Sequence, residues 1–306
     1  MDYSEAVAAF FAPRPEGTPL PEAVLAGASA RRLRDACEPI AMHAVWSPLT
    51  NERLAQLGLN FLTSYVGGRA AAMGEPVGAV VAAAFAWFSP ELVTSVYDAA
   101  RQAVPRERLL TERDAATCES LRAVLVGAGA AAAEIAAVAD LLASAVEPAD
   151  GTGRPLFSGL RSRGRPADPV QRLWWACDLV REHRGDSHVA AAAAAGLGAV
   201  EMNILTELWL GMPLLSYTGT RGWSDDAMQA AVAGLEARGW VRDAALTEAG
   251  RAVRSQVEAR TDAQEQQIVD SIDSRLDAVC AQLDRWGARC VEAGAFPADT
   301  LKRAAG

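Results

Sequence analysis

Residues 231–258 read AVAGLEARGWVRDAALTEAGRAVRSQVE. Apolar residues at helical spacing predict a helix over 225–237, and the glycine of the ARGW segment ends it. Two short strands are expected at 240–241 and 246–247, and a long helix begins at Glu248. The expected order is therefore helix, glycine stop, small hairpin and long helix.

The composition around this stretch favours helices. Alanine runs at 70–72, 82–84 and 190–195 are strong helix formers and poor strand formers. Apolar residues make up 51% of the 306-residue chain, which is enough for a sizeable core. We therefore expect an all-α fold with small β-wings.

The net charge of −9 limits which kinds of partner the chain can bind. Such a chain repels nucleic acid and anionic membranes unless a basic patch forms locally. No segment is apolar for long enough to span a membrane, and the N-terminus lacks the basic region of a secretory signal. The cysteines are scattered without a CxxC motif, which indicates reduced thiols and a cytoplasmic protein.

The chain matches itself at an offset of 140 that drifts to 135. RLRDACEPIAMH at 32–43 lies over RLWWACDLVREH at 172–183, and WFSPEL at 87–92 lies over GWSDDA at 222–227. The matched residues include Cys, His and Ser in the same order. In both copies a serine followed by acidic residues predicts a helix start. The sequence therefore predicts a pseudo-symmetric tandem of two repeats.

The boundaries of these repeats follow from composition. Residues 1–30 are rich in Pro and Gly and are expected to form an N-terminal arm, followed by a first repeat at 31–146. A Pro-, Gly- and Arg-rich stretch at 147–170 is predicted as a linker. The second repeat, 171–306, ends in a C-terminal helix that is expected to cover the core, with a homodimer seam as the alternative.

The opening stretch resembles the recognition helix and wing of MarR-like winged helix-turn-helix proteins. With RGWSDDAM before it and REHRGDSH further upstream, residues 30–265 resemble a family of winged-helix proteins from high-GC bacteria. These proteins are known as MarR-like or SalK-like, and the family has no general assigned activity. The resemblance implies two winged-helix-like repeats on an all-helical scaffold, and it implies no reaction.

The predicted recognition helix is poorly suited to DNA. Each phosphate contact needs a Lys or Arg, and affinity scales with their number. The wing is short, and its turn carries a single arginine. The exposed side of the helix carries Asp225, Asp226, Gln229, Ala230, Ala233 and Glu236, with Arg238 only at its far end. The sequence therefore favours a winged-helix scaffold used for another purpose, with a ligand-responsive DNA-binding regulator as the alternative.

The polar stretch REHRGDSHV at 181–189 is the leading site candidate. If two repeats pack about a pseudo-two-fold axis, the helices that end at His43 and His183 meet near that axis, where pockets form. The candidate catalytic residues are His183, Asp186, His188 and His43. The candidate ligand-binding residues are Arg184, Glu38, Trp46, Trp174 and Trp175.

Three kinds of chemistry fit this neighbourhood. His183, Asp186 and His188 resemble a two-His-one-carboxylate site for a divalent metal, although no motif implies a cofactor. Alternatively, a histidine acts as general base with Asp186 fixing its tautomer. In the third form, Arg184 anchors a carboxylate or enolate of an otherwise apolar ligand.

A purely structural explanation competes with these. Gly185 is expected to end one helix, and Asp186 or Ser187 to cap the next, which makes the stretch a helix–helix corner. The main functional hypothesis is a small-molecule-binding protein of bacterial specialised metabolism, with or without enzymatic activity. Its apolar ligand would lie in a cavity at the repeat interface, edged by the His/Asp/Arg cluster.

Overall fold

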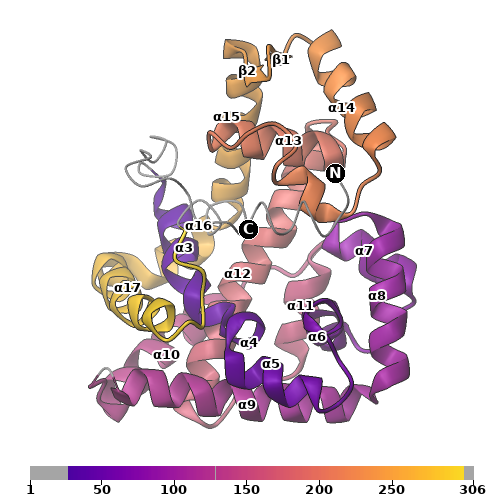
Figure 1. The fold of residues 1–306 in the computed structure, drawn as a ribbon. Coiled ribbons are helices and arrows are strands. Elements are labelled where there is room, and N and C mark those ends of the chain that lie inside the picture. Colours follow the sequence, from indigo (N-terminus) through magenta and orange to yellow (C-terminus); the bar gives the residue numbers. More distant parts are fainter. Residues whose placement is uncertain (1–26, 128, 300–306) are drawn as a thin grey trace.

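The computed structural model of the protein describes residues 27–127 and 129–299. Most of the N-terminal arm predicted for 1–30 lies outside the described residues, as do the last residues of the predicted second repeat. The described chain folds into helices and one small hairpin (Figure 1). The all-α fold with a small β-wing is thus confirmed.

In the described part of the first half, 27–146, every regular element is a helix. These elements are α3 (Ser29–Ala41), α4 (His43–Trp46), α5 (Pro48–Ala55), α6 (Phe61–Ala70), the 3-10 helix η1 (Ala71–Met73), α7 (Gly78–Phe85), α8 (Pro90–Ala103), α9 (Arg106–Gly127) and α10 (Ala132–Val146).

The second half, 147–299, contains the hairpin. Its elements are α11 (Pro155–Ser162), α12 (Pro169–Ala194), α13 (Ala199–Trp209), the 3-10 helix η2 (Thr218–Arg221), α14 (Asp225–Ala237), β1 (Val241–Arg242), β2 (Ala245–Leu246), α15 (Glu248–Gln264), α16 (Gln266–Ile272), the 3-10 helix η3 (Asp273–Arg275) and α17 (Leu276–Glu292).

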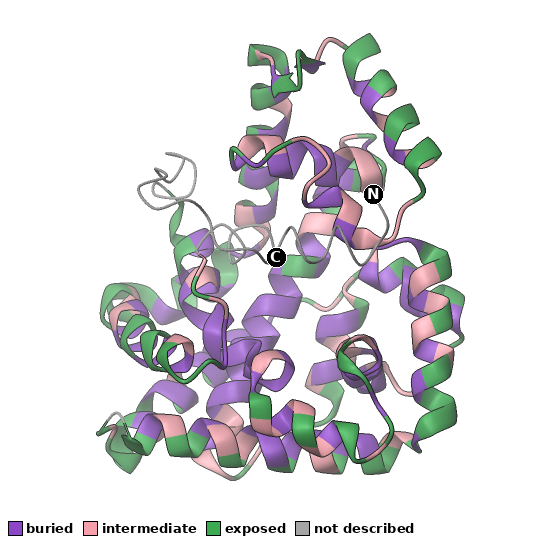
Figure 2. Ribbon diagram, viewed as in Figure 1, coloured by how far each residue is buried: buried purple, intermediate pink, exposed green. Residues whose placement is uncertain are grey.

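Helix α12 is the central element of the fold (Figure 1). Asp168 begins it by accepting the backbone N–H groups of Val170 and Gln171, with proline at its first position. The helix packs against α3, α10, α11 and α15, and most of its residues are buried (Figure 2). Within the described ranges no single helix is long and apolar enough to cross a membrane, whereas α12 and α13, bent by 108° at their junction, reach that length and composition only together.

Two hydrophobic clusters hold α12 in place. The larger one joins α12 to α3, α10 and α17, and it includes the C-terminal helix residues Leu283 and Trp286. The C-terminal helix therefore covers the core, as expected. The second cluster joins the end of α12 to α13, α14, α15 and the hairpin through Ile204, Leu235 and Val257.

The hairpin forms where the sequence predicted it. Its first strand begins one residue later than expected, and its second strand begins one residue earlier. Val241–Arg242 pairs antiparallel with Ala245–Leu246. The two turn residues, Asp243 and Ala244, both have positive φ (51° and 56°), as a two-residue turn of primed type requires. Thr247 then caps α15 by accepting the N–H of residue 250. Local turn and cap chemistry thus builds the wing and its following helix.

The structure differs from the expected tandem in three places. The described part of the first half has no wing, because α8 leads through Val104 and Pro105 directly into α9. The predicted linker contains helix α11. The predicted corner at 181–189 is wrong, because α12 runs straight through Gly185. The helix starts after Ser89 and Ser224 are present in both halves, and the tandem duplication itself stays a prediction.

Candidate functional site

A cavity of about 100 Å³ lies where the two halves of the chain meet. Its walls come from α3, α6 and α7 of the first half and from α11, α12, α13, η2 and α15 of the second. We call it the arginine cavity, because seven arginine side chains line it. They are Arg31, Arg34, Arg69, Arg181, Arg184, Arg221 and Arg254.

Helical spacing brings these arginines to one place. Arg31 and Arg34 lie one turn apart on α3, and Arg181 and Arg184 lie one turn apart on α12, so each pair shares a helix face. All four are buried, although arginine is usually exposed. Burial of this kind requires acidic partners, because an unpaired buried charge is strongly destabilising.

Glu258 on α15 binds three of the seven arginines. Its carboxylate accepts hydrogen bonds from Arg184 (2.5 Å), Arg254 (2.7 Å) and Arg31 (2.9 Å). Burial alone would raise the pKa of Glu258, but the charges of Arg254, Arg184 and Arg31 outweigh it and hold this pKa well below its usual range. Glu258 therefore joins α3, α12 and α15 through one buried carboxylate.

Glu182 makes the corresponding connection to the first half. Arg69 on α6 donates two hydrogen bonds to its carboxylate, from Nε at 2.9 Å and from Nη2 at 2.8 Å, and Arg181 donates a third at 2.9 Å. Burial raises the pKa of Glu182, and the charges of Arg69 and Arg181 more than reverse that shift. Planar guanidinium groups suit this two-point pairing with a carboxylate.

Arg221 differs from the other six arginines. Its guanidinium carbon lies 4.1 Å from the ring centre of Tyr217 and 4.5 Å from that of Phe88, so the group is held between two aromatic rings. Its side chain makes no hydrogen bond or ion pair with any described residue, and its Nε is a buried donor without an acceptor. Arg221 thus presents an oriented and uncompensated positive charge to the cavity.

The backbone of the segment around Arg221 is tied to the first half. The Arg221 carbonyl accepts the N–H of Ser89 at 2.8 Å, at the start of α8. The indole N–H of Trp223 donates to the carbonyl of Trp87 at 3.1 Å, and Asn203 donates to the same carbonyl at 2.8 Å. These bonds fix the direction from which Arg221 enters the cavity.

Three of the predicted site residues line this cavity: Arg184, Asp186 and His188. Asp186 accepts the backbone N–H of Phe157 at 3.0 Å, at the start of α11, and burial raises its pKa to about 7. His188 is hydrogen-bonded through Nδ1 to the Thr261 hydroxyl at 3.0 Å. Burial, with Arg254 nearby, lowers the pKa of His188 well below its usual value, so its ring is neutral at pH 7.

His183 and Glu38 lie behind the cavity wall. His183 donates from Nδ1 to the Glu265 carboxylate at 2.8 Å, and its ring meets Phe157 edge to face at 4.8 Å. Glu38 pairs with Arg34 at 3.3 Å and holds that arginine in position. These two candidates hold helices and arginines in place and do not line the arginine cavity.

The other candidates lie elsewhere in the fold. His43 is hydrogen-bonded to the Ser120 hydroxyl at 2.9 Å, and burial lowers its pKa to about 4. The indole N–H groups of Trp174 and Trp175 donate to backbone carbonyls in the core, and Trp46 packs on a neighbouring phenylalanine. The expected gathering of all three histidines at one axis is therefore wrong.

The expected metal site is not formed by the described residues, which contain no group of three or more His, Cys, Asp or Glu side chains placed to hold an ion. His183 contacts Glu265, which lies at the end of α15, and His188 contacts Thr261 within the same helix. Each histidine is thus occupied by a separate structural contact, and the two do not converge with Asp186.

The sequence did not reveal the remaining members of the cavity. Arg31 and Arg34 share a face of α3 with Asp35 and Glu38, and Arg254 precedes Glu258 by one turn on α15. Opposite charges one helical turn apart were the available signal. Arg221 had no such signal, because one of its two ring partners, Phe88, comes from a segment distant in the sequence.

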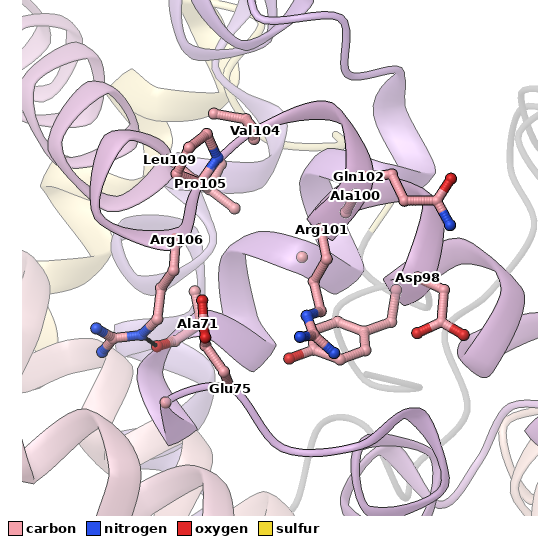
Figure 3. A pocket seen from close by; sticks show the side chains of 13 residues that line it. Ala71, Glu75, Asp98, Ala100, Arg101, Gln102, Val104, Pro105, Arg106 and Leu109 are labelled. Atoms are coloured by element: carbon pink, nitrogen blue, oxygen red, sulfur yellow. Dashed lines mark hydrogen bonds between the residues drawn. The ribbon is translucent and has the colours of Figure 1, made fainter.

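A second cavity, of about 280 Å³, lies between α6, η1, α8 and α9 (Figure 3). Arg101 stacks over the ring of Tyr97, and Arg106 donates from Nε to the carbonyl of Ala71 at 2.8 Å. In this view the Glu75 side chain lies between the two arginines (Figure 3). Arg101 and Glu75 are exposed, so water and salt weaken their charges, and the arginine cavity is the stronger candidate.

The outer surface of α14 is acidic, as the sequence predicted. Asp225, Asp226 and Glu236 are exposed. Arg238 at the end of the helix is paired with Glu201 of α13, which lowers its availability for a phosphate. The helix that would enter a major groove therefore offers little positive charge.

Helices α13 and α14, which pack against each other, together with the hairpin and α15, define a helix-turn-helix protein with a wing. A family model described as a helix-turn-helix family matches residues 30–297, and the chain belongs to this family. The match spans both halves and includes every residue that lines the arginine cavity. Comparisons with curated proteins and with solved structures found no match.

Proposed function

We propose that the protein binds a small organic anion in the arginine cavity. The observation that carries this proposal is Arg221, a guanidinium held between two rings without any acidic partner among the described residues. A partly buried positive charge without a partner destabilises the folded protein, and it is expected to remain only where it serves a function. A carboxylate or phosphate oxygen would supply the missing acceptor.

The cavity is well organised for such a ligand. The rings of Phe88 and Tyr217 restrict the guanidinium of Arg221 before binding, so little conformational entropy is lost on binding. The edge of the group then offers N–H donors in one plane, which matches a carboxylate or phosphate. Phe85 and Trp87 line the same space and would contact the apolar part of the ligand. The proposed ligand is therefore anionic, whereas the sequence suggested a mainly apolar molecule.

We propose binding and not a reaction. The carboxylate of Asp186 already caps α11, and Nδ1 of His188 is bonded to Thr261. A general base needs an unoccupied atom within hydrogen-bond reach of the substrate proton. Each side chain is thus anchored through one atom to a structural partner, Asp186 at the start of α11 and His188 at Thr261, and the proposal extends to recognition and not to catalysis.

Replacing Arg221 with glutamine is expected to weaken anion binding at least tenfold. Glutamine keeps some of the length and loses the charge, and a hydrogen bond to a charged group contributes about 1.5–3 kcal/mol. Isothermal titration calorimetry with succinate, benzoate and inorganic phosphate measures the effect. The matched control is Arg238→Gln on α14, which lies outside the cavity. Equal affinities of the wild type and of Arg221→Gln for every one of the three probes that binds would remove the basis of the proposal.

Transcriptional regulation of the MarR-like kind is the second candidate, and the family match and the wing favour it. The acidic outer face of α14 argues against it, so we expect no sequence-specific gel shift at physiological salt with DNA from upstream of the protein's own gene. A specific, salt-dependent shift that Arg238→Gln or Arg242→Gln weakens would support the regulator instead. A MarR-like or SalK-like identity and a role in bacterial specialised metabolism rest on the resemblance of 221–258 and stay proposals.

A further inference from the structure

His188 turns one ring nitrogen toward α15 and leaves the other available to the arginine cavity. Its Nδ1 lies 3.0 Å from the Thr261 hydroxyl. The nitrogen on the opposite side of the ring, Nε2, makes no hydrogen bond with a residue of the described ranges. Because His188 lines the cavity and is only partly buried, Nε2 is the polar atom of this side chain that an occupant of the cavity can reach.

The Thr261 hydroxyl decides which nitrogen carries the ring proton. A hydroxyl has one hydrogen to donate, and Thr261 donates it to the carbonyl of Val257 at 2.9 Å. Thr261 therefore accepts from His188, which places the proton on Nδ1. The ring is neutral at pH 7, because burial, with Arg254 nearby, lowers the pKa of His188. Nε2 is thus an unprotonated acceptor in a cavity that guanidinium donors line.

Two neighbouring residues bring this acceptor and Arg221 into one site. The His188 ring packs on Trp87, with the ring centres 5.4 Å apart. The guanidinium of Arg221 packs on the next residue, Phe88, at 4.5 Å from the ring centre. Consecutive residues are about 3.8 Å apart at Cα, so these two supports are adjacent. An occupant of this space therefore meets a cationic donor at Arg221 and a neutral acceptor at His188.

These two contact points require different chemistry in the occupant. A carboxylate or phosphate oxygen suits Arg221, whereas the lone pair of Nε2 repels such an oxygen and binds an O–H or N–H donor. Asp186 lines the same cavity and accepts the N–H of Phe157, so in its ionised form it adds an acceptor and no donor. An anion without a donor of its own would leave Nε2 without a partner, which is unfavourable in a site of this kind.

The donor is better supplied by a hydroxyl than by an ammonium group. Burial and the charge of Arg254 already disfavour a positive charge on the His188 ring. They disfavour an ammonium group beside that ring for the same reason. A hydroxyl donates equally well and brings no charge.

From these contacts we infer that the ligand of the arginine cavity is a hydroxycarboxylate, whose carboxylate binds Arg221 and whose hydroxyl donates to Nε2 of His188. This inference rests on the proposed function and narrows it from anions in general to one class. His188 is then the residue that distinguishes a hydroxy acid from the same acid without the hydroxyl group.

The test compares acids that differ in the hydroxyl group alone. Malate is paired with succinate, and mandelate with phenylacetate, at pH 8, where their carboxyl groups are all ionised. In calorimetry on the full chain, the hydroxy acid of at least one pair is expected to bind about fivefold tighter than its partner or more. O-methylmandelate keeps the oxygen and lacks its hydrogen, and aspartate carries ammonium in place of hydroxyl. Neither should gain over phenylacetate and succinate, respectively.

The variant His188→Phe tests whether this side chain is the source of the preference. Phenylalanine keeps a ring to pack on Trp87 and removes both nitrogens, so the ratio of the two affinities is expected to fall to about twofold or less. Arg238→Gln on α14 should keep the full ratio, and thermal unfolding verifies that both variants fold. A ratio that survives in His188→Phe would assign the hydroxyl to another acceptor, such as Asp186, and overturn the inference.

The position of the proton has a readout in the wild type alone. A long-range 1H–15N spectrum separates protonated from unprotonated imidazole nitrogens, and the chain has only three histidines. For His188 it should show the proton on Nδ1, with the Nε2 signal shifting when the tighter hydroxy acid is added. A proton on Nε2 contradicts the inference whether or not the variant folds.

The outcomes distinguish this inference from the proposed function. Equal affinities within both pairs, equal binding of aspartate and malate, or binding of phosphate or benzoate without any hydroxy acid would overturn the inference alone. If none of these acids binds, and inorganic phosphate and benzoate also fail, the proposed function is overturned with it.

Discussion

Replacing Glu258 with glutamine is expected to lower the free energy of unfolding by about 3–5 kcal/mol, the range for breaking a buried ion pair from one side. The carboxylate is nearly inaccessible to water and accepts hydrogen bonds from Arg31, Arg184 and Arg254. Glutamine offers one acceptor oxygen and turns N–H donors toward cations. Three guanidinium groups would then repel one another at the junction of α3, α12 and α15.

Chemical denaturation of the wild type and of Glu258→Gln measures this loss. The control is Glu292→Gln, which removes a pair with Arg289 at the protein surface and is expected to change stability by no more than about 0.5 kcal/mol. A loss below about 1 kcal/mol for Glu258→Gln would mean that the three arginines find other partners and that Glu258 does not hold α3, α12 and α15 together.

The same carboxylate gives a pH dependence with a defined sign. Its pKa in the folded protein lies well below the ordinary value of 4.5, so the folded state favours the ionised form. The contribution of the ionised Glu258 carboxylate to the free energy of unfolding is present above about pH 4.5 and is lost as the pH falls below that value. The stability difference between the wild type and Glu258→Gln should therefore narrow on acidification below pH 4.5.

Replacing Glu207 with glutamine is expected to cost about 3 kcal/mol and to weaken anion binding as well. Glu207 on α13 is fully buried, and its carboxylate accepts the backbone N–H groups of Leu215, Tyr217 and Thr218 and the hydroxyl of Thr218. Burial raises the pKa of Glu207 to about 7, so the comparison is made at pH 8, where the carboxylate is mainly ionised. Hydrogen bonds to a charged acceptor contribute about 1.5–3 kcal/mol each, and glutamine cannot accept all four. The loop that it organises carries Tyr217, one of the two rings on Arg221.

Two measurements separate the effects of this change. Denaturation reports the loss of stability, and succinate titration at a temperature where the variant is folded reports the loss of affinity. Glu236→Gln on the exposed face of α14 serves as the control and should leave both unchanged. A variant that loses stability and binds succinate normally would show that the 215–218 loop does not position Arg221.

The sequence was most informative where structure depends on neighbouring residues. The serine at 224, the glycine at 239 and Thr247 each act within a few residues, so α14, the hairpin and α15 were predicted nearly to the residue. The corner at 181–189 was wrong for the converse reason. Glycine within a helix costs only about 1 kcal/mol relative to alanine, and the burial of most of α12 outweighs that cost.

The site was predicted only in part, because its partners are far apart in the sequence. Arg184, Asp186 and His188 stand out as a local polar cluster, and all three line the cavity. The acid that binds Arg184 lies 74 residues away on α15, and no spacing rule joins them. Arg221 is defined by two rings from different segments. Chemistry that depends on tertiary contacts does not appear as a motif.

The bonds between 87–89 and 221–224 have one further consequence. These two segments resemble each other in sequence, with WFS at 87–89 and GWS at 222–224. They are also joined by hydrogen bonds in the folded chain: the Ser89 N–H donates to the Arg221 carbonyl, and the Trp223 indole N–H donates to the Trp87 carbonyl. Each segment ends in the serine that starts a helix, α8 or α14. The two stretches are thus under a shared geometric constraint. Evolution can alter either one only within the tolerance that the other allows.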